Sequence, residues 1–435
     1  MKIGRSFWTV LAVVIITTTA SILIEELLVF RLMVLWVGIF VFAYIWTYLS
    51  LHGISLSRYS RDDRIEAGGY LREVYEIQNN SWLWKVWLEV LDKSAIPFSA
   101  NSRILTRIGR GEKRSFISYT QVYKRGYYQL GPTVIRSGDL LGIFRREMEI
   151  ESKQSILVTP LILEIDRLDE PAGFLPGGKP YSQKTNEITP FAAGIDEYHP
   201  GDPLNKIHWL STARMNKIMV KEFDYDPLAN VFIVLDLAAS VQWDAVREIV
   251  PKKYWMMDFR TQKEIIPSSM DYLCAIGASL CNYYIHRQYG VGIIARDQGW
   301  QLLAAEHGER QLIKVLEALA LAEGTGELSL DTVVRLQVHS LPRGSFIWLV
   351  TPLFTEEVLT AAEVIRMRGM QVRIAALDGL SFGLEEVRNT VFLPSEADPH
   401  IRRIPMAKNV QEITQCLIAG QEAVPSSGSF FQAAK

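Results

Sequence analysis

Cysteine is scarce in this chain. Its 435 residues include only Cys274, Cys281 and Cys416, and no two of them form a C-x-x-C pair. A small, odd number of cysteines without that spacing argues against a disulfide framework and against a cysteine-based zinc site.

An excess of charge of either sign is also lacking. Lysine and arginine total 46, and aspartate and glutamate total 48, so the formal net charge is −2. A general nucleic-acid-binding protein usually shows a clear basic excess, and we do not expect that class of partner. Hydrophobic residues (49%) and charged residues (22%) exclude a mainly disordered chain. The length suggests about three folding units, at roughly 150 residues per domain.

Common catalytic motifs are equally hard to find. No nucleophile–base constellation stands out, and the H-E-x-x-H pattern of zinc-dependent hydrolases does not occur. The stretch Pro176-Gly177-Gly178-Lys179-Pro180 lacks the serine or threonine that ends a phosphate-binding loop. Catalysis is therefore the alternative hypothesis for this chain and not the first one.

Long uncharged runs are present near the N-terminus. Phe7–Ile24 and Leu32–Leu51 contain no charged residue. Each run has close to the ~20 residues that a helix needs to cross a bilayer. The short connection between them contains Glu25 and Glu26, so residues 1–51 are predicted to form a transmembrane helical hairpin. The alternative is a cleaved signal peptide that ends near Ala20.

Basic residues flank the outer ends of this hairpin. Lys2 and Arg5 precede the first run, and Arg58, Arg61 and Arg64 follow the second. Basic residues near membrane spans favour the cytoplasmic side. We therefore expect a protein of the cell membrane, with both termini and the main domains in the cytoplasm. Free cysteines suit that compartment.

Residues 52–165 have the pattern of an all-β sandwich. Polar and apolar residues alternate over Tyr70–Ile77, the turn Asn79-Asn80-Ser81 follows, and an apolar-rich run extends over Trp82–Leu91. Short strands separated by turns at this spacing are typical of sandwiches. Within the last run we expect the tryptophans to pack in the core, with ligand stacking as the alternative. These tryptophans are Trp82, Trp84 and Trp87.

The rest of the chain is predicted to consist of three segments. Residues 166–228 form a linker and an extended charged arm, and residues 421–435 form a disordered tail. Between them, residues 229–420 alternate between apolar strands and helical periods. This alternation predicts an α/β domain with a doubly wound parallel sheet.

A candidate metal site lies after the first strand of that sheet. Asp236 directly follows the apolar run 231–235, and Ser240 stands four residues later. Ligand sites in open α/β sheets form beyond the carboxyl ends of the strands. Carboxylate and hydroxyl oxygens suit Mg²⁺.

Several motifs occur in a recognisable order along the chain. They are Arg125-Gly126-Tyr127, Leu130-Gly131-Pro132, the run 138–144, the run 197–202, Ile207-His208-Trp209, Thr212-Ala213-Arg214 and Val220-Lys221-Glu222-Phe223. With these motifs the chain resembles the bacterial membrane proteins grouped as domain of unknown function family 58. The α/β segment resembles a von Willebrand factor A-type domain with a metal-dependent adhesion site.

The metal site departs from the family pattern. Asp236 and Ser240 match it, and Thr325 matches the family threonine, but Ala238 replaces a serine and Thr351-Pro352 replaces an aspartate. With so few oxygen ligands, Mg²⁺ is expected to bind weakly or not at all, and no other cofactor is expected. The alternative role for Asp236 is to cap a turn or a helix through backbone N–H groups. A zinc site could also be drawn around His199 and His208, although their spacing matches no regular pattern.

The arm and the loop after Asp236 are the predicted partner-binding surface. The arm contributes Arg214 and Lys221, and the long loop 242–268 contributes Trp243 and Trp255. Long loops at the carboxyl edge of a sheet often serve recognition, although this loop could equally fold down as a lid.

The resemblance also implies a function. Members of the family are typically encoded beside MoxR-type AAA+ ATPases and transglutaminase-like membrane proteins. It implies a membrane-anchored scaffold or adaptor that works with such an ATPase in the assembly or maturation of other proteins. The alternative is a metal-dependent hydrolase that acts near the cell envelope.

Overall fold

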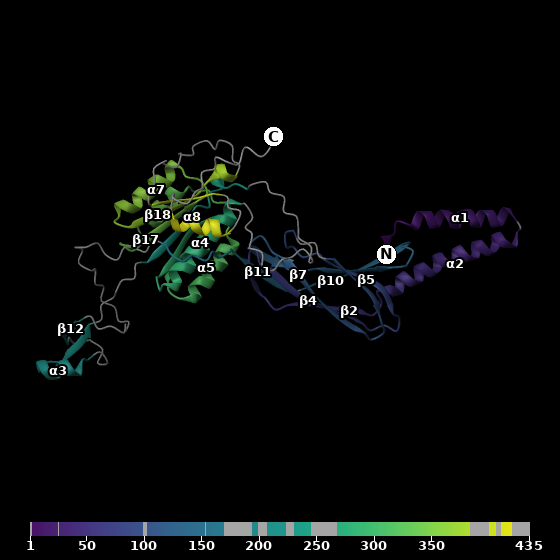
Figure 1. Ribbon diagram of the computed structural model, residues 1–435, viewed down its shortest axis with the longest axis horizontal. Coiled ribbons are helices and arrows are strands. Elements are labelled where there is room, and N and C mark those ends of the chain that lie inside the picture. The colour runs from purple at the N-terminus through teal and green to yellow at the C-terminus, as the bar shows by residue number, and fades with distance from the viewer. Residues whose placement is uncertain are drawn as a thin grey trace.

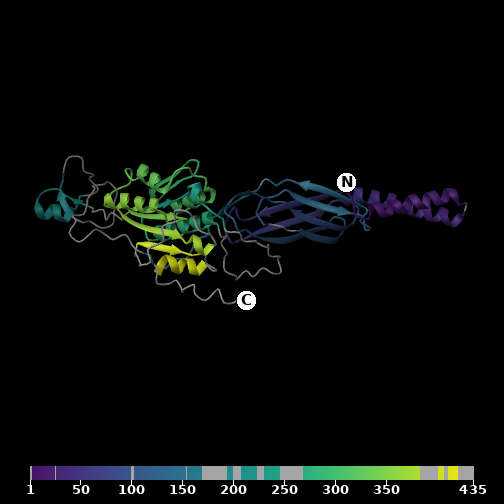
Figure 2. The same ribbon diagram turned by 90° about the horizontal axis from the view of Figure 1, so that it is seen from above.

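The computed structural model describes residues 2–24, 26–98, 102–152, 154–168, 194–198, 207–222, 230–244, 268–382, 400–405 and 410–419. Figures 1 and 2 show a helical hairpin, a β-sandwich and an α/β domain arranged end to end, with the hairpin at one end of the molecule.

The hairpin consists of α1 (Phe7–Leu23) and α2 (Leu27–Ser50). Helix α2 has a mean hydropathy of 2.3 and is long and apolar enough to cross a membrane; α1 is a shorter apolar helix of 17 residues. Most of the apolar side chains of both helices lie on the surface, including Ile22, Leu35 and Phe42. Such a surface is stable in hydrocarbon and unfavourable in water. One N-terminal helix that could span a membrane is therefore present.

The hairpin is joined closely to the sandwich. Phe144 of the sandwich lies between the two helices, with its ring 5.6 Å from that of Phe7 and 5.2 Å from that of Phe40. The buried Lys85 caps the C-terminal end of α2: its Nζ donates to the carbonyl oxygens of Leu49 and His52, both at 2.9 Å. A cation suits the carboxyl end of a helix, where the last carbonyls have no partner within the helix.

The sandwich contains a five-stranded and a three-stranded sheet that face one another, and a further sheet of three short strands. The first has the order β1-β10-β9-β5-β6, the second β2-β4-β7 and the third β3-β11-β8. Residues Tyr75, Ile77, Leu88 and Ile135 fill the space between the first two sheets. The strands are β1 (Lys2–Ile3), β2 (Ile54–Ser60), β3 (Arg64–Glu66), β4 (Tyr70–Asn79), β5 (Lys85–Asp92), β6 (Ser102–Ile108), β7 (Lys113–Gln121), β8 (Gly126–Gln129), β9 (Thr133–Gly138), β10 (Phe144–Ile150) and β11 (Ser155–Thr159).

Two of the tryptophans that were predicted to lie in this core are exposed. Trp82 keeps 71% and Trp84 53% of its surface accessible. Both belong to the loop between β4 and β5, which Asn79 holds through its side-chain amide to the carbonyl oxygens of Leu83 and Gly109. The loop conformation points these rings outward, so the core-packing prediction is wrong for them.

The α/β domain has a mixed six-stranded sheet with the order β16-β15-β14-β17-β18-β19. All neighbours pair in parallel except β15 and β16. A wholly parallel sheet was expected; β16 differs because only three residues separate it from β15, and a connection that short can join only antiparallel strands. The strands are β14 (Val231–Leu235), β15 (Val291–Arg296), β16 (Trp300–Glu306), β17 (Phe346–Thr351), β18 (Gln371–Leu377) and β19 (Ile401–Ile404).

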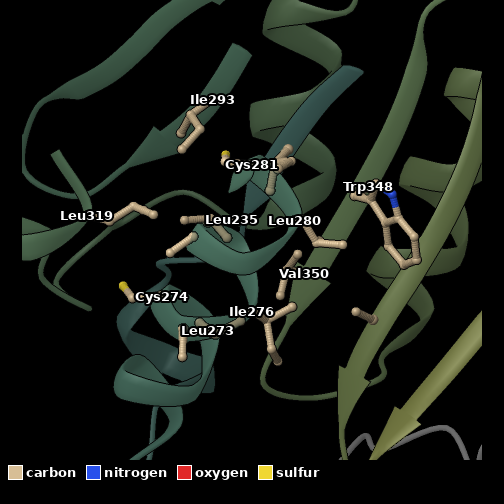
Figure 3. Packing of buried hydrophobic residues seen from close by; sticks show 14 of the residues in the cluster. Leu235, Leu273, Cys274, Ile276, Leu280, Cys281, Ile293, Leu319, Trp348 and Val350 are labelled. Carbon is tan, nitrogen blue, oxygen red and sulfur yellow. The ribbon is translucent and has the colours of Figure 1, made fainter. Parts of the chain in front are cut away.

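Helices cover both faces of this sheet. Side chains of α4, α5 and α8 share one core with Ile233 and Leu235, and side chains of α6 and α7 share the other with Phe232 and Val234. Figure 3 shows Leu235 of β14, Leu280 of α4 and Val350 of β17 meeting in the first core. The helices are α4 (Ser269–His286), α5 (Glu309–Leu321), α6 (Leu330–Gln337), α7 (Glu356–Met367) and α8 (Val410–Ala419).

Buried polar contacts join the sandwich to the α/β domain. Arg125, between β7 and β8, forms an ion pair with Asp271 in the first turn of α4. The same guanidinium donates to the carbonyl oxygens of Leu319 (3.1 Å) and Ala322 (2.8 Å) at the end of α5. The backbone N–H of Leu163 donates to Ser279 Oγ of α4 at 2.8 Å.

A small unit lies apart from the α/β domain in both views (Figures 1 and 2). It consists of β12 (Gly194–Glu197), α3 (Trp209–Met215) and β13 (Met219–Glu222), and the two strands pair antiparallel. Trp209, Leu210 and Met215 on α3 are exposed.

Candidate functional site

The strand order places a switch point between β14 and β17. The helix that follows β14 packs on one face of the sheet, and the helix that follows β17 packs on the other. Connections that diverge in this way leave room at the carboxyl ends of the two strands, which is where open α/β sheets bind ligands. Asp236 follows β14 and Thr351 ends β17, so the switch point brings these two residues together.

The carboxyl group of Asp236 is held inside the protein. The residue is only 5% exposed, its Oδ2 lies 2.9 Å from Thr351 Oγ1, and its Oδ1 accepts the backbone N–H of Ala238 at 3.3 Å. Burial raises the pKa of Asp236 to about 6, and the hydrogen bonds from Thr351 and Ala238 oppose that rise only in part. Burial disfavours the charged form of an acid because water no longer solvates it.

The contacts of Thr351 also favour a neutral Asp236. Its Oγ1 lies 2.8 Å from the carbonyl oxygen of Leu353, in addition to the contact with Asp236. A hydroxyl has one proton to donate, so it cannot serve both oxygens when Asp236 is ionised. When Asp236 is protonated, its O–H donates to Thr351 and the threonine donates to Leu353, which satisfies both contacts.

The residues predicted to bind Mg²⁺ do not fit that ion. Both carboxylate oxygens of Asp236 face partners within the protein. The segments that carry Ser240 and Thr325 lie side by side, because Ala238 and Gly326 form a backbone bridge, but both residues are exposed while Asp236 is buried. In the part of the chain that the structure describes, no three histidine, cysteine, aspartate or glutamate side chains gather as a metal site would require. Mg²⁺ needs oxygen ligands in near-octahedral geometry and loses its waters reluctantly. A buried carboxyl whose two oxygens already contact Thr351 and Ala238 is a poor ligand for it.

The segment after Asp236 is tied to the start of α4. Gln242 Nε2 donates to the carbonyl oxygen of Asp236 at 2.8 Å, and its Oε1 accepts from Ser269 Oγ at 2.6 Å. Trp243 continues this contact: its backbone N–H donates to Ser269 Oγ at 3.0 Å, and its ring lies 4.4 Å from that of Phe382. Trp243, predicted to bind a partner, is thus half-buried against the α/β core.

The other predicted partner-binding residues lie further away. Arg214 is exposed in the last turn of α3. Lys221 belongs to β13, where the structure describes the backbone but not this side chain. Trp255, within the loop 245–267, lies outside the described residues.

His208 has a structural role. Its Nδ1 accepts the backbone N–H of Ser211 at 3.2 Å and thereby caps the start of α3. Ordinarily a serine, threonine or aspartate oxygen does this. His199, the other histidine considered as a zinc ligand, lies outside the described residues.

One motif was missed in the sequence. Residues 379–383 have the spacing G-x-S-x-G and follow β18, as a serine-hydrolase nucleophile would. The nucleophile of such an enzyme sits on a sharp, strained turn with its hydroxyl exposed. Ser381 instead lies in a 3-10 turn without positive φ, and its Oγ donates to the carbonyl oxygen of Asp378 at 2.7 Å. This geometry does not support a nucleophile.

Comparison with known proteins gives one family match and one curated relative. Residues 195–387 match the family described as "Protein of unknown function DUF58". The "Uncharacterized protein YeaD" of Bacillus subtilis (strain 168) is 22% identical over 246 residues, which cover 55% of this chain and 54% of that protein. The match therefore spans about half the length of this relative.

Solved structures resemble the chain only weakly. The CARDB domain of the PF1109 protein from Pyrococcus furiosus has a TM-score of 0.17 and 8% identity, covering 24% of this chain and 91% of that domain. A β-glucosidase from Listeria innocua has a TM-score of 0.15 and 12% identity, covering 23% of this chain and 16% of the enzyme. Similarities at this level carry no conclusion about fold or activity.

Proposed function

We propose that the chain is a membrane-anchored adaptor whose main domains face the cytoplasm. The observation that carries the proposal is that specific contacts join the hairpin, the sandwich and the α/β domain in series. An apolar hairpin is fixed to the sandwich through Phe144 and Lys85, and the sandwich is fixed to the α/β domain through Arg125. Such a series of joined parts holds the far end at a set distance from the bilayer, which suits a scaffold.

In this proposal both α1 and α2 span the membrane. Helix α1 has 17 residues, or about 26 Å at 1.5 Å per residue, which is close to the ~30 Å hydrocarbon thickness. Snorkelling of residues at its ends accommodates the small difference. Basic residues lie at the base of the hairpin, where Lys2 and Arg5 precede α1, and acids lie at its tip, at Glu25 and Glu26. This distribution favours a cytoplasmic position for the termini.

The α/β domain is proposed to be of the von Willebrand factor A type. Its support is the doubly wound order around the central strand β14 and the position of Asp236 directly after that strand. Without a metal, such a domain would recognise its partner through side chains alone.

The adaptor hypothesis is preferred to a metal-dependent hydrolase. A hydrolase needs several ionisable groups that converge on an open pocket. At the switch point, the described residues contribute one buried carboxyl group, and that group is engaged by Thr351 and Ala238. The proposed partners are a MoxR-type AAA+ ATPase and a transglutaminase-like membrane protein.

The proposed docking surface includes α3 and the loop after Asp236. Aromatic and arginine residues contribute most of the binding energy of typical interfaces. A short helix that exposes apolar side chains beside a cation suits a protein partner. On α3 these are Trp209, Met215 and Arg214. From the loop, Trp255 is proposed to contact the partner.

Co-purification from native membranes tests this function. Arg214→Ala and Trp255→Ala should each reduce recovery of an AAA+ ATPase at least about tenfold, because truncation of a central interface residue typically costs about 2 kcal/mol or more. Met367→Ala is the control, since Met367 is 80% exposed and lies at the end of α7, outside the proposed docking surface. If the wild-type chain brings down no ATPase, the adaptor assignment is wrong. If the variants bind the ATPase fully, the docking surface lies elsewhere.

A further inference from the structure

Large apolar side chains gather, exposed, at the end of the sandwich that meets the hairpin. Trp82 and Trp84 lie in the loop between β4 and β5. Leu140 and Leu141, which are 74% and 53% exposed, lie in the loop between β9 and β10. Apolar groups of this size are unfavourable in water and usually mark an interaction surface.

The first loop lies beside the end of α2. The backbone N–H of Asn80 donates to the carbonyl oxygen of Gly53 at 2.7 Å. The indole ring of Trp84 lies 6.1 Å from that of Trp46 on α2. The exposed rings of this loop thus begin at the level where the apolar helix ends.

The second loop lies beside the start of α1. The backbone N–H of Gly4 donates to the carbonyl oxygen of Ile143 at 2.8 Å. The buried carboxylate of Asp139 fixes the loop, because it accepts the backbone N–H groups of Leu141 (2.8 Å), Ile143 (3.1 Å) and Phe144 (2.7 Å). Leu140 and Leu141 are therefore held on the surface by a turn that the hydrogen bonds to Asp139 fix.

Basic side chains surround both loops. Arg5 precedes α1, and Arg145 of β10 pairs with Lys2 of β1. Arg107 lies near the end of β6 and Arg110 in the turn that follows it; all four side chains are exposed. The neighbouring acids are paired. Glu112 accepts from Arg114 Nε and from the N–H of Gly109, both at 2.6 Å. Glu147 meets Lys2 at 2.6 Å and Arg136 at 2.8 Å.

We propose that these two loops form a membrane-contact surface that inserts into the interfacial region of a leaflet containing anionic phospholipid. The inference rests on the proposed membrane anchoring. Indole rings concentrate at the headgroup level of bilayers, and basic residues near the surface gain from anionic lipid. One loop lies beside the end of α2 and the other beside the start of α1, so a bilayer that surrounds the hairpin meets both at once. The sandwich then stands fixed on the membrane instead of swinging on its helices.

Site-specific labelling of the full-length chain tests this surface. Trp84→Cys and Leu141→Cys are labelled with an environment-sensitive fluorophore, and the chain is reconstituted into vesicles of phosphatidylcholine and phosphatidylglycerol. Cys274, Cys281 and Cys416 are buried, so labelling is expected at the new position. Phe42→Cys, on the exposed face of α2, reports the hydrocarbon. Phe98→Cys, an exposed aromatic position at the opposite end of the sandwich, reports water.

The emission maxima of the labels at positions 84 and 141 should lie at shorter wavelength than that of the label at position 98. Nitroxide lipids should quench them, and aqueous iodide should not. The blue shift should decrease in vesicles without phosphatidylglycerol, and an unchanged shift would contradict the assignment to anionic lipid.

Two outcomes distinguish a failure of the proposed contact surface from a failure of the proposed membrane anchoring. If lipid quenches the label at position 42 while iodide reaches positions 84 and 141, the hairpin is inserted and the contact surface is wrong. If iodide reaches position 42 as well and carbonate washes the chain from the vesicles, the anchoring itself is wrong. Protection of positions 84 and 141 in detergent that increases with protein concentration would assign the surface to a second copy of the chain and overturn the proposal.

Discussion

Asp236 is a buried acid whose environment sets its charge. Its Oδ2 accepts from Thr351 and its Oδ1 accepts from Ala238, while burial raises the pKa of the carboxyl to about 6. The same residue type at the same place could equally hold a metal. The difference depends on whether an oxygen of the carboxylate is left facing outward.

The first prediction concerns the stability of Asp236→Asn. Burial raises the pKa of Asp236 from 3.8 to about 6, so the folded state holds this proton more tightly than the unfolded state. Stability is therefore unaffected below pH 4 and is lost as the pH rises from about 4 to 6, by about 3 kcal/mol in all. Asparagine can donate to Thr351 and accept from Ala238 without a charge.

Urea unfolding of the solubilised chain measures this effect. The variant should be more stable than the wild type at pH 7.5 and close to it at pH 4.5, and the difference should grow through the interval between. A variant that is less stable at pH 7.5 would show that the ionised carboxylate is needed in the fold.

The second prediction concerns magnesium. Because Ala238 and Pro352 offer no side-chain oxygen and Asp236 faces inward, calorimetry should detect no site tighter than about millimolar, the weak end for sparse oxygen ligands. A micromolar site that disappears in Asp236→Ala would refute both the fit and the neutral carboxyl.

At the scale of elements, the joint between the sandwich and the α/β domain depends on a few contacts to α4 and α5. Arg125 makes the buried ion pair. Arg64 of β3 also reaches α5, where it pairs with Glu317, but both of those side chains are about half exposed. The two arginines offer a matched comparison of a buried and an exposed ion pair across one joint.

The third prediction uses that comparison. Arg125→Ala leaves Asp271 buried without its cation and two carbonyl groups without a donor, which typically costs about 3–5 kcal/mol. Arg64→Ala should cost less than about 1 kcal/mol, because water screens an exposed pair. Limited proteolysis and thermal unfolding should show a loosened joint only in the first variant. Equal effects would show that the joint does not depend on the buried pair.

Much of the α/β domain could be predicted at this scale. Apolar runs at 231–235, 291–295 and 346–350 form β14, β15 and β17, because strands buried on both faces need continuous apolar sequence. Edge strand β16 and helix α6 were missed for different reasons. Leu302 of β16 is exposed, so the apolar pattern of that strand is weak. Helix α6 is strongly amphipathic, but its 8 residues are shorter than the window in which a helical period can be recognised.

The joint and the site were harder to predict for a different reason. Arg125 and Asp271 are 146 positions apart and belong to different domains, and nothing local marks either residue as a partner. Asp236 was correctly placed at the end of a strand, but its inward contact with Thr351 depends on the spatial order of β14 and β17. The outward tryptophans of the β4–β5 loop follow from the turn held by Asn79, which an alternating pattern does not reveal.

At the scale of the whole molecule, the hairpin decides where every other part lies. If only α2 spanned the bilayer, the N-terminus and the sandwich would be on opposite sides, and β1 (Lys2–Ile3) could not pair with β10 of the sandwich as it does in the structure. If α1 and α2 both span it, the two ends of the chain are on the same side. The proposed partners and the proposed lipid contacts of Trp84 and Leu141 require the second arrangement with the cytoplasm as the common side.

A pair of topology reporters tests this central claim most directly. A reporter that is active only outside the cytoplasm is fused after Lys435 in one version of the chain and inserted between Ile24 and Leu27 in another. The account predicts a silent reporter at Lys435 and an active one at the hairpin tip, because basic residues flank the outer ends of both helices and acids occupy the tip. Strong activity at Lys435 would contradict it, since the main domains would then lie outside the cytoplasm.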